Sequence, residues 1–184
     1  MQSILRAFES ASPEDVHEGI NWYSNALSFA RSLDSDERKA AGVIAALSPR
    51  QAWDTNKEGA KKLLTAAQRH SSIIPTVAGT YHNVQKAWKI ANGANPEEAL
   101  IPFEPNRAFK VPRFYANILG NTEVVTVDVW AARVAVKNAP DAIRGTLYLK
   151  IEKMYQRAAQ TIGTITPRDL QAVCWVHIRR TQGE

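Results

Sequence analysis

Apolar residues recur along most of the chain at the three- and four-residue spacing of amphipathic helices. The pattern predicts helices over residues 12–33, 35–48, 53–70, 80–91, 110–120, 147–162 and 167–180. Ser12-Pro13-Glu14-Asp15 and Thr166-Pro167-Arg168-Asp169 each combine a cap residue, a first-turn proline and acids that complement the helix dipole. Only residues 124–129 have the propensity of a strand, and one strand alone cannot form a sheet. The sequence therefore predicts an all-α protein.

One acid interrupts the apolar run VVTVDVWAARVAV, residues 124–136. An unpaired charge among these side chains would cost on the order of several kcal/mol, so Asp128 needs a partner. We interpret Asp128 as the N-cap of the helix that follows, where backbone N–H groups would satisfy it. Lys110, eighteen residues earlier, opens the preceding predicted helix. If the two helices begin side by side, they bring a lysine and an aspartate together, either as a salt bridge or as a reaction site.

Charge and composition narrow the possible partners and setting. The 184 residues carry a net charge of +5, and the basic residues gather in the stretches 50–69, 107–113 and 179–180. This favours a polyanionic partner such as DNA, although a solvated basic face explains it as well. No stretch approaches the roughly 20 apolar residues that span a bilayer, the N-terminus lacks signal-peptide features, and Cys174 is the single cysteine. We therefore expect a cytoplasmic protein with no membrane partner.

Residues 110–134 resemble the helix-hairpin-helix DNA glycosylase superfamily, in particular its endonuclease III branch. That family has a hairpin, a lysine that opens a helix, a Val-Asp pair eighteen residues later and an arginine five residues beyond. The corresponding residues here are Pro105, Lys110, Val127, Asp128 and Arg133. The stretch from Ala45 to Lys57 and the closing stretch from Ile151 to Trp175 extend the likeness, in order, over about residues 36–180.

The chain departs from the family pattern at several positions. Asn106 and Ala108 replace the hairpin glycines, and Ala disfavours the positive φ that lets a hairpin approach a phosphate. Val129 and Trp130 replace the family's Thr-His, and the cysteine cluster of many members is absent. A set of small bacteriophage proteins in the same superfamily is also similar. Its pattern falls on Ser48, Pro49, Trp53, Asn56, Lys110, Phe114, Asn117, Asp128, Gln171, Trp175 and Arg179.

The resemblance implies a two-lobed fold with a central cleft, in which residues 35–95 form one lobe and residues 1–34 plus 96–184 form the other. It implies that Asp128 stabilises a cationic transition state and that Lys110 is a nucleophile or a phosphate holder. The implied DNA- or substrate-binding residues are Ser48, Arg50, Gln51, Trp53, Asn56, Asn106, Arg107, Arg113, Asn117, Trp130, Arg133, Gln171, Trp175 and Arg179. No cofactor is expected, and the scattered histidines show no metal-binding spacing.

Two of these features have equally simple structural explanations. The stretch from Ser48 to Asn56 is either a loop that enters DNA or an ordinary turn between helices with a buried Trp53. Gln171, Trp175 and Arg179 share one helical face, on which Trp175 is either a base-stacking platform or a core anchor.

Three functions follow from the sequence. The first is excision of a modified or damaged DNA base. The second is the phage-type transferase, which replaces pyrophosphate on 5-pyrophosphoryloxymethyl-uracil in DNA with an amino acid or polyamine co-substrate. The third is a helical DNA-binding protein without catalysis.

Overall fold

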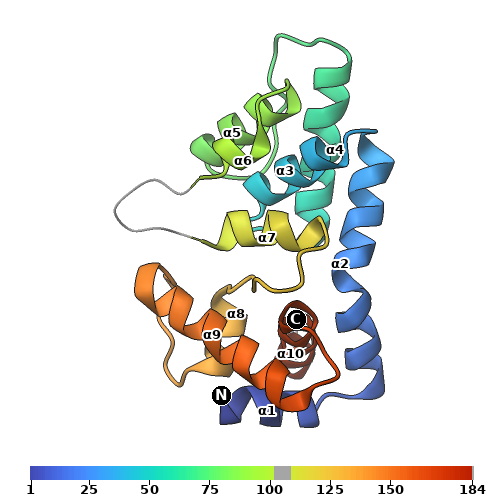
Figure 1. Cartoon of the computed structure of the whole chain (residues 1–184). Helices are drawn as coiled ribbons and strands as arrows, with labels where there is room; N and C mark the ends of the chain where they lie inside the picture. Colours follow the sequence, from blue (N-terminus) through green and yellow to red (C-terminus); the bar gives the residue numbers. More distant parts are fainter. Residues whose placement is uncertain (102–108, 184) are drawn as a thin grey trace. The chain divides into compact units, whose positions relative to one another are not determined.

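A computed structural model describes residues 1–101 and 109–183, and within these ranges it contains helices and no strand (Figure 1). The all-α prediction is therefore confirmed. The helices are α1 (Gln2–Glu9), α2 (Pro13–Leu33), α3 (Glu37–Leu47), α4 (Trp53–Gln68), α5 (Tyr81–Ala91), α6 (Pro96–Ala99), α7 (Lys110–Ile118), α8 (Val129–Ala135), α9 (Gly145–Ile162) and α10 (Pro167–Thr181).

The pattern did not predict α1 or α6. Helix α1 has no side-chain cap, and its N-cap position is Met1, so the usual start signal is missing. It is held instead by Ile4, which is fully buried in the core of its unit. Helix α6 is a four-residue turn capped by Asn95, too short to show periodicity. Helix α1 therefore depends on packing, whereas α6 has a local cap but is too short for a periodic pattern.

The chain divides into two compact units, and the division falls within α2. One unit comprises Met1–Asn25 and Pro102–Glu184, and the second comprises Ala26–Ile101. The first unit is discontinuous because the second is inserted between its two segments. The expected lobes had boundaries at 34/35 and 95/96, so they place the end of α2 and the residues around α6 differently.

The inserted unit, 26–101, is organised around α3. Every residue of α3 from Ala40 to Leu47 is buried, so this part of the helix is apolar on all sides, and only its first turn is charged. Asp36 caps it by accepting hydrogen bonds from the backbone of the first turn. A Cβ atom on Gly42 would lie 2.8 Å from Pro96 Cβ, so the glycine permits the close approach of α3 and α6. Helices α4 and α5 also pack on α3.

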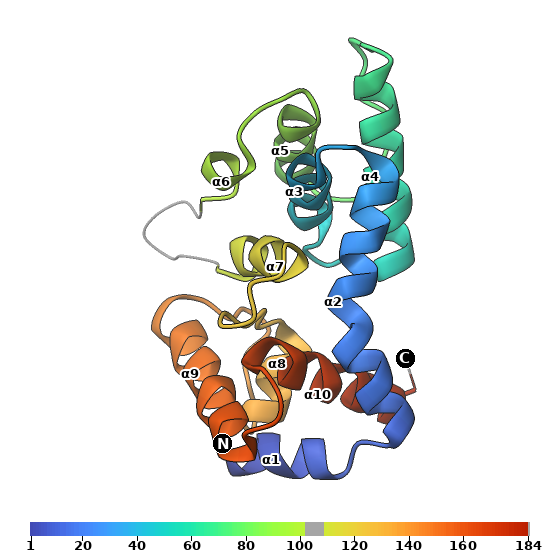
Figure 2. The same ribbon diagram turned by 45° about the vertical axis from the view of Figure 1, so that its right-hand side comes forward.

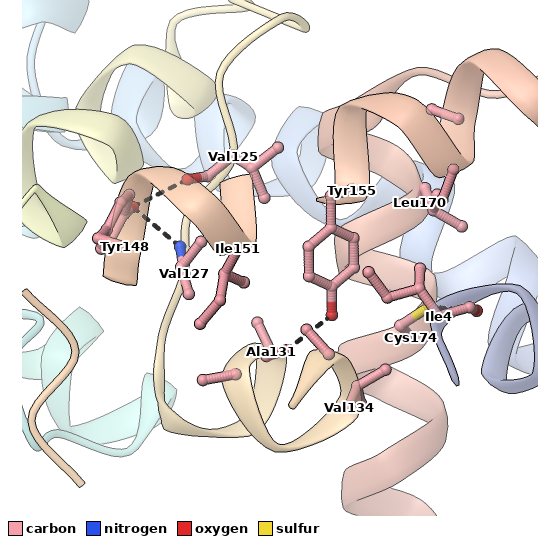
Figure 3. Packing of buried hydrophobic residues seen from close by; sticks show 14 residues of the cluster. Ile4, Val125, Val127, Ala131, Val134, Tyr148, Ile151, Tyr155, Leu170 and Cys174 are labelled. Atoms are coloured by element: carbon pink, nitrogen blue, oxygen red, sulfur yellow. Dashed lines mark hydrogen bonds between the residues drawn. The ribbon is translucent and has the colours of Figure 1, made fainter. Parts of the chain in front are cut away.

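The core of the discontinuous unit lies among α1, α8, α9 and α10, which gather together in both ribbon views (Figures 1 and 2). Tyr148, Ile151 and Tyr155 of α9 are fully buried there, and the Tyr155 hydroxyl donates to the Ala131 carbonyl at 3.0 Å (Figure 3). Burial raises the pKa of the Cys174 thiol to about 12. Cys174 is fully buried in this core, where it acts as a packing residue.

The start of α2 is joined to α10 within this unit. The predicted cap is confirmed, because Ser12 and Asp15 exchange hydrogen bonds of 3.1 Å as a capping box. Asp15 is buried and also contacts His177, at 2.9 Å, and Arg180. Although burial acts to raise the pKa of Asp15, these hydrogen bonds and the Arg180 charge lower it overall. None of the helices in the described part of the chain combines the length and apolarity needed to cross a membrane.

We predict that Gly19→Ala destabilises the discontinuous unit. A Cβ atom on Gly19 would lie 2.5 Å from Val173 Cα, a backbone atom of α10 that cannot move aside locally. The expected loss in the free energy of unfolding is about 2 kcal/mol, because overpacking outweighs the helix propensity gained by alanine. Thermal and urea unfolding measure it. The exposed Ser24→Ala in the same helix is the control, and equal stability of the two variants would contradict the close packing.

Candidate active site

Two helices of the discontinuous unit begin at the pair of charged residues that the sequence indicates. Lys110 is the first residue of α7, and Asp128 is the N-cap of α8. Asp128 has an extended backbone, with φ −97° and ψ −174°, and its Oδ1 accepts the Ala131 N–H at 2.8 Å. The predicted cap is therefore confirmed. Both side chains are half-buried.

The segment that leads to Asp128 is buried and extended, and its backbone hydrogen-bonds to side chains. The Tyr148 hydroxyl donates to the Val125 carbonyl at 2.8 Å and accepts the Val127 N–H at 2.9 Å (Figure 3). The Val125 N–H donates to Glu152 Oε1 at 2.9 Å. Buried backbone groups need partners, and here α9 supplies those that a neighbouring strand would supply in a sheet.

A third side chain, Asn117 of α7, completes the support. Asn117 is fully buried, and its Nδ2 donates to the carbonyls of Asn121 and Val124, each at 2.8 Å. Its Oδ1 accepts the Thr126 hydroxyl at 2.7 Å. The structure thus uses the amide of this predicted substrate residue entirely inside the protein.

The buried Glu152 connects the segment to α7. Its carboxylate lies 3.1 Å from Arg113 Nε, and the Arg113 guanidinium lies over the Phe109 ring at 5.7 Å. Arg113 was predicted to bind substrate; in the structure its guanidinium is engaged with Glu152. The carboxylate therefore has a charged partner and a backbone donor, which a buried acid requires.

The second carboxylate oxygen of Asp128 accepts a hydrogen bond from Trp175. The indole Nε1–H donates to Asp128 Oδ2 at 2.9 Å. The Arg179 guanidinium lies 4.5 Å from the centre of the Trp175 ring, and Trp22 packs edge-on at 5.6 Å. Trp175 is half-buried. Its burial is therefore intermediate between that of an exposed base-stacking platform and that of a core anchor, the two roles that the sequence allows. Gln171, on the same helical face, is buried and accepts the Tyr23 hydroxyl at 2.9 Å.

The environment of Lys110 changes the pKa of its amine. Burial lowers the pKa of the Lys110 amine below its ordinary value, and the negative charge of Asp128 opposes part of that shift. Asp128 is therefore the charged group that acts on Lys110, and the two residues stand at the starts of α8 and α7. A lysine with a lowered pKa has a larger neutral, nucleophilic fraction near pH 7 than a surface lysine.

Two further predicted residues lie on α8. The Arg133 guanidinium lies over the Trp130 ring at 4.8 Å and 3.4 Å from Asp141. Arg133 is exposed, so its charge is accessible to solvent. It follows Asp128 closely in the sequence. Asn106 and Arg107 lie outside the described residues.

The predicted loop, Ser48 to Asn56, belongs to the inserted unit. Arg50 is exposed and has a positive φ of 60°, an uncommon conformation for a residue other than glycine. Trp53 packs edge-on against Phe29 at 6.1 Å, with Lys57 over its ring. Ser48 and Asn56 are buried, and Asn56 Nδ2 donates to a carbonyl of α3; Gln51 is half-buried.

Sequence reasoning missed Tyr148, Glu152 and Trp22. Tyr148 and Glu152 are four residues apart on α9, so a carboxylate on the buried face of a helix was the available signal. Trp22 carries no such signal, because an aromatic residue in an amphipathic helix is ordinary. Across the ranges 1–101 and 109–183, no group of three or more His, Cys, Asp or Glu residues could hold a metal ion.

The fold and site define an all-helical protein with a lysine and a hydrogen-bonded aspartate at two helix starts. The chain belongs to DUF7178, a family of unknown function, whose match covers residues 1–182. No curated protein and no solved structure matches the chain.

We predict that Tyr148→Phe loosens the segment before Asp128. Its hydroxyl serves two buried backbone groups, so its loss should lower the free energy of unfolding by about 2–4 kcal/mol. Amide hydrogen exchange at Val127 should also accelerate. Tyr155→Phe is the matched control, because it removes one hydrogen bond from the same core. Unchanged exchange at Val127 would show that Tyr148 does not hold the segment.

We further predict that Asp128→Asn lowers the pKa of Lys110. The Asp128 carboxylate favours the charged ammonium, so removing its charge leaves burial less opposed and the amine loses its proton at lower pH. A ¹³C NMR titration of the lysine Cε signals measures this pKa. The exposed Glu9→Gln, in the same unit, should leave it unchanged. An unmoved Lys110 titration in Asp128→Asn would mean that the two charges do not interact.

Proposed function

We propose that this chain is a DNA-base-processing enzyme of the helix-hairpin-helix glycosylase kind, which excises a modified or damaged base. The observation that carries the proposal is a carboxylate held at both oxygens, electrostatically coupled to a half-buried lysine whose pKa burial lowers. Perturbed titratable groups of this kind cluster at functional sites. The ordered likeness over residues 36–180 supports the same reading.

The proposal includes the two-lobed glycosylase-like fold. Its support is the order of the matched motifs along the chain together with the discontinuous unit, which the residues Ala26–Ile101 interrupt. A single helical bundle would not be expected to divide into one continuous and one discontinuous unit. The cationic residues along the chain and the net charge of +5 support DNA as the partner.

The chemistry assigns different roles to the two residues. Breaking the bond between C1′ of the sugar and the base nitrogen leaves positive charge on the sugar, which a fixed carboxylate stabilises. Asp128 is suited to this role because its orientation is set by two hydrogen bonds. The neutral amine of Lys110 can attack C1′ and form a Schiff base, or the ammonium can hold a phosphate.

The likeness to the small bacteriophage proteins favours a second candidate, the transferase. Its pattern recurs here at both Lys110 and Asp128 and at the late residues Gln171, Trp175 and Arg179. In that reaction an amine replaces pyrophosphate on the CH₂ group of the base. Asp128 would take a proton from the incoming amine, and Lys110 would hold the departing phosphates.

Base release separates these functions. Single-stranded and duplex oligonucleotides with uracil, 5-hydroxymethyluracil or oxidised bases are incubated with the protein and treated with alkali. Excision predicts strand breaks that Asp128→Asn reduces by about 100-fold or more. Asp36→Asn, the same substitution at the N-cap of α3, is the control. Borohydride trapping on the DNA, with Lys110→Ala as its control, tests whether Lys110 forms the Schiff base.

The transferase predicts a different product. DNA that contains 5-pyrophosphoryloxymethyl-uracil is incubated with amino acids or polyamines, and its nucleosides are analysed by mass spectrometry. An amine-substituted nucleoside with released pyrophosphate and no base release would establish transfer. DNA binding with neither product, and unchanged in Asp128→Asn, would indicate a non-catalytic protein and end the enzyme proposal.

A further inference from the structure

Asp128 is oriented at two points, and the two donors differ in origin. The Ala131 N–H on Oδ1 comes from the helix that Asp128 caps, and any capping aspartate would have it. The Trp175 Nε1–H on Oδ2 comes from α10, 47 residues away in sequence. Capping does not require this second bond. It fixes the rotation of the carboxylate, which the single cap bond leaves free.

The donor is itself held rigidly. The neighbours of Trp175 along α10, Cys174 and Val176, are buried, so the helix cannot turn without disturbing the core. The edge-on contact with Trp22 and the Arg179 guanidinium over the ring restrict the indole further. An indole N–H is a donor only and does not titrate, so it presents the same proton to Asp128 at every working pH.

This arrangement argues against Trp175 as the base-stacking platform. The guanidinium of Arg179 already lies over the ring, 4.5 Å from its centre, and the polar edge of the indole faces Asp128. A base stacked on that face would have to displace the arginine. The contacts of Trp175 are instead those of a group that holds another side chain in place.

We propose that Trp175 is a positioning residue, which orients the Asp128 carboxylate through Nε1–H···Oδ2 for the reaction at this site. The inference rests on the proposed function for its catalytic consequence, but the orientation itself can be measured without any reaction. A misdirected carboxylate stabilises the transition state less well while substrate contacts elsewhere persist. The hydrogen bond should therefore affect kcat and leave KM almost unchanged.

The first experiment reads the orientation through Lys110. Trp175→Phe keeps an aromatic ring but removes the donor, so the Oδ2 charge is no longer offset by the indole N–H. The pKa of Lys110, measured by ¹³C NMR titration, should then rise. In an Asp128→Asn background the same substitution should leave it unmoved, because no carboxylate remains to be reoriented. A pKa of Lys110 that does not respond to Trp175→Phe, or that shifts equally in both backgrounds, overturns the proposal.

The second experiment reads the consequence for catalysis, on whichever oligonucleotide gives base release. We expect Trp175→Phe to lower kcat by about 10- to 100-fold with KM nearly unchanged. If the phenylalanine variant does not fold, 3-benzothienylalanine at position 175 keeps the ring shape and replaces only the N–H by sulfur. Loss of activity through KM alone, or full activity of this isostere, overturns the positioning role.

The two experiments separate this inference from the proposed function. A Lys110 titration that responds as expected, with no base release or transfer from any substrate, retains the Asp128–Trp175 coupling and removes the enzyme. Base release that depends on Asp128 but not on the Trp175 donor retains the enzyme and removes the positioning role.

Discussion

The hydrogen bonds that α9 donates to and accepts from the extended segment 124–127 are the constraint on which the site depends. Residues 125–127 of this valine-rich segment are buried, and no strand lies beside it in the described structure. Tyr148 and Glu152 serve the backbone at Val125 and Val127. Without them, several buried polar groups would lack partners, at a cost of about 1–3 kcal/mol each. Asp128 is the next residue in the chain, so these hydrogen bonds also fix the position of its backbone.

The same constraint explains how two charged groups are tolerated beside an apolar core. Glu152 is paired with Arg113 and a backbone N–H, and Asp128 accepts from Ala131 and Trp175. Burial lowers the pKa of the Lys110 amine by more than the charge of Asp128 raises it. A protein that needed only stability would be as well served by apolar residues here. The presence of a polar network at this position therefore supports a functional role for the site.

Much of the fold follows from local sequence signals, and the exceptions have identifiable causes. The caps at Ser12, Asp128 and Thr166 mark true helix starts, because capping depends on residues three positions apart. Helix α1 lacks such a signal and is held by the burial of Ile4, which only packing can reveal. The strand-like valines of 124–127 are extended without forming a sheet, since side chains replace the missing neighbour.

The sequence by itself determined the helical class, most of the helix starts and the two charged residues worth attention. These depend on periodicity and capping, which act over a few residues. The tertiary structure decided which groups meet Asp128. Trp175 and Asp128 are 47 residues apart, and no local rule relates them. It also decided that the buried Asn117 hydrogen-bonds to the segment before Asp128 and that Arg113 pairs with Glu152, because these partners lie far apart in the sequence or on different elements.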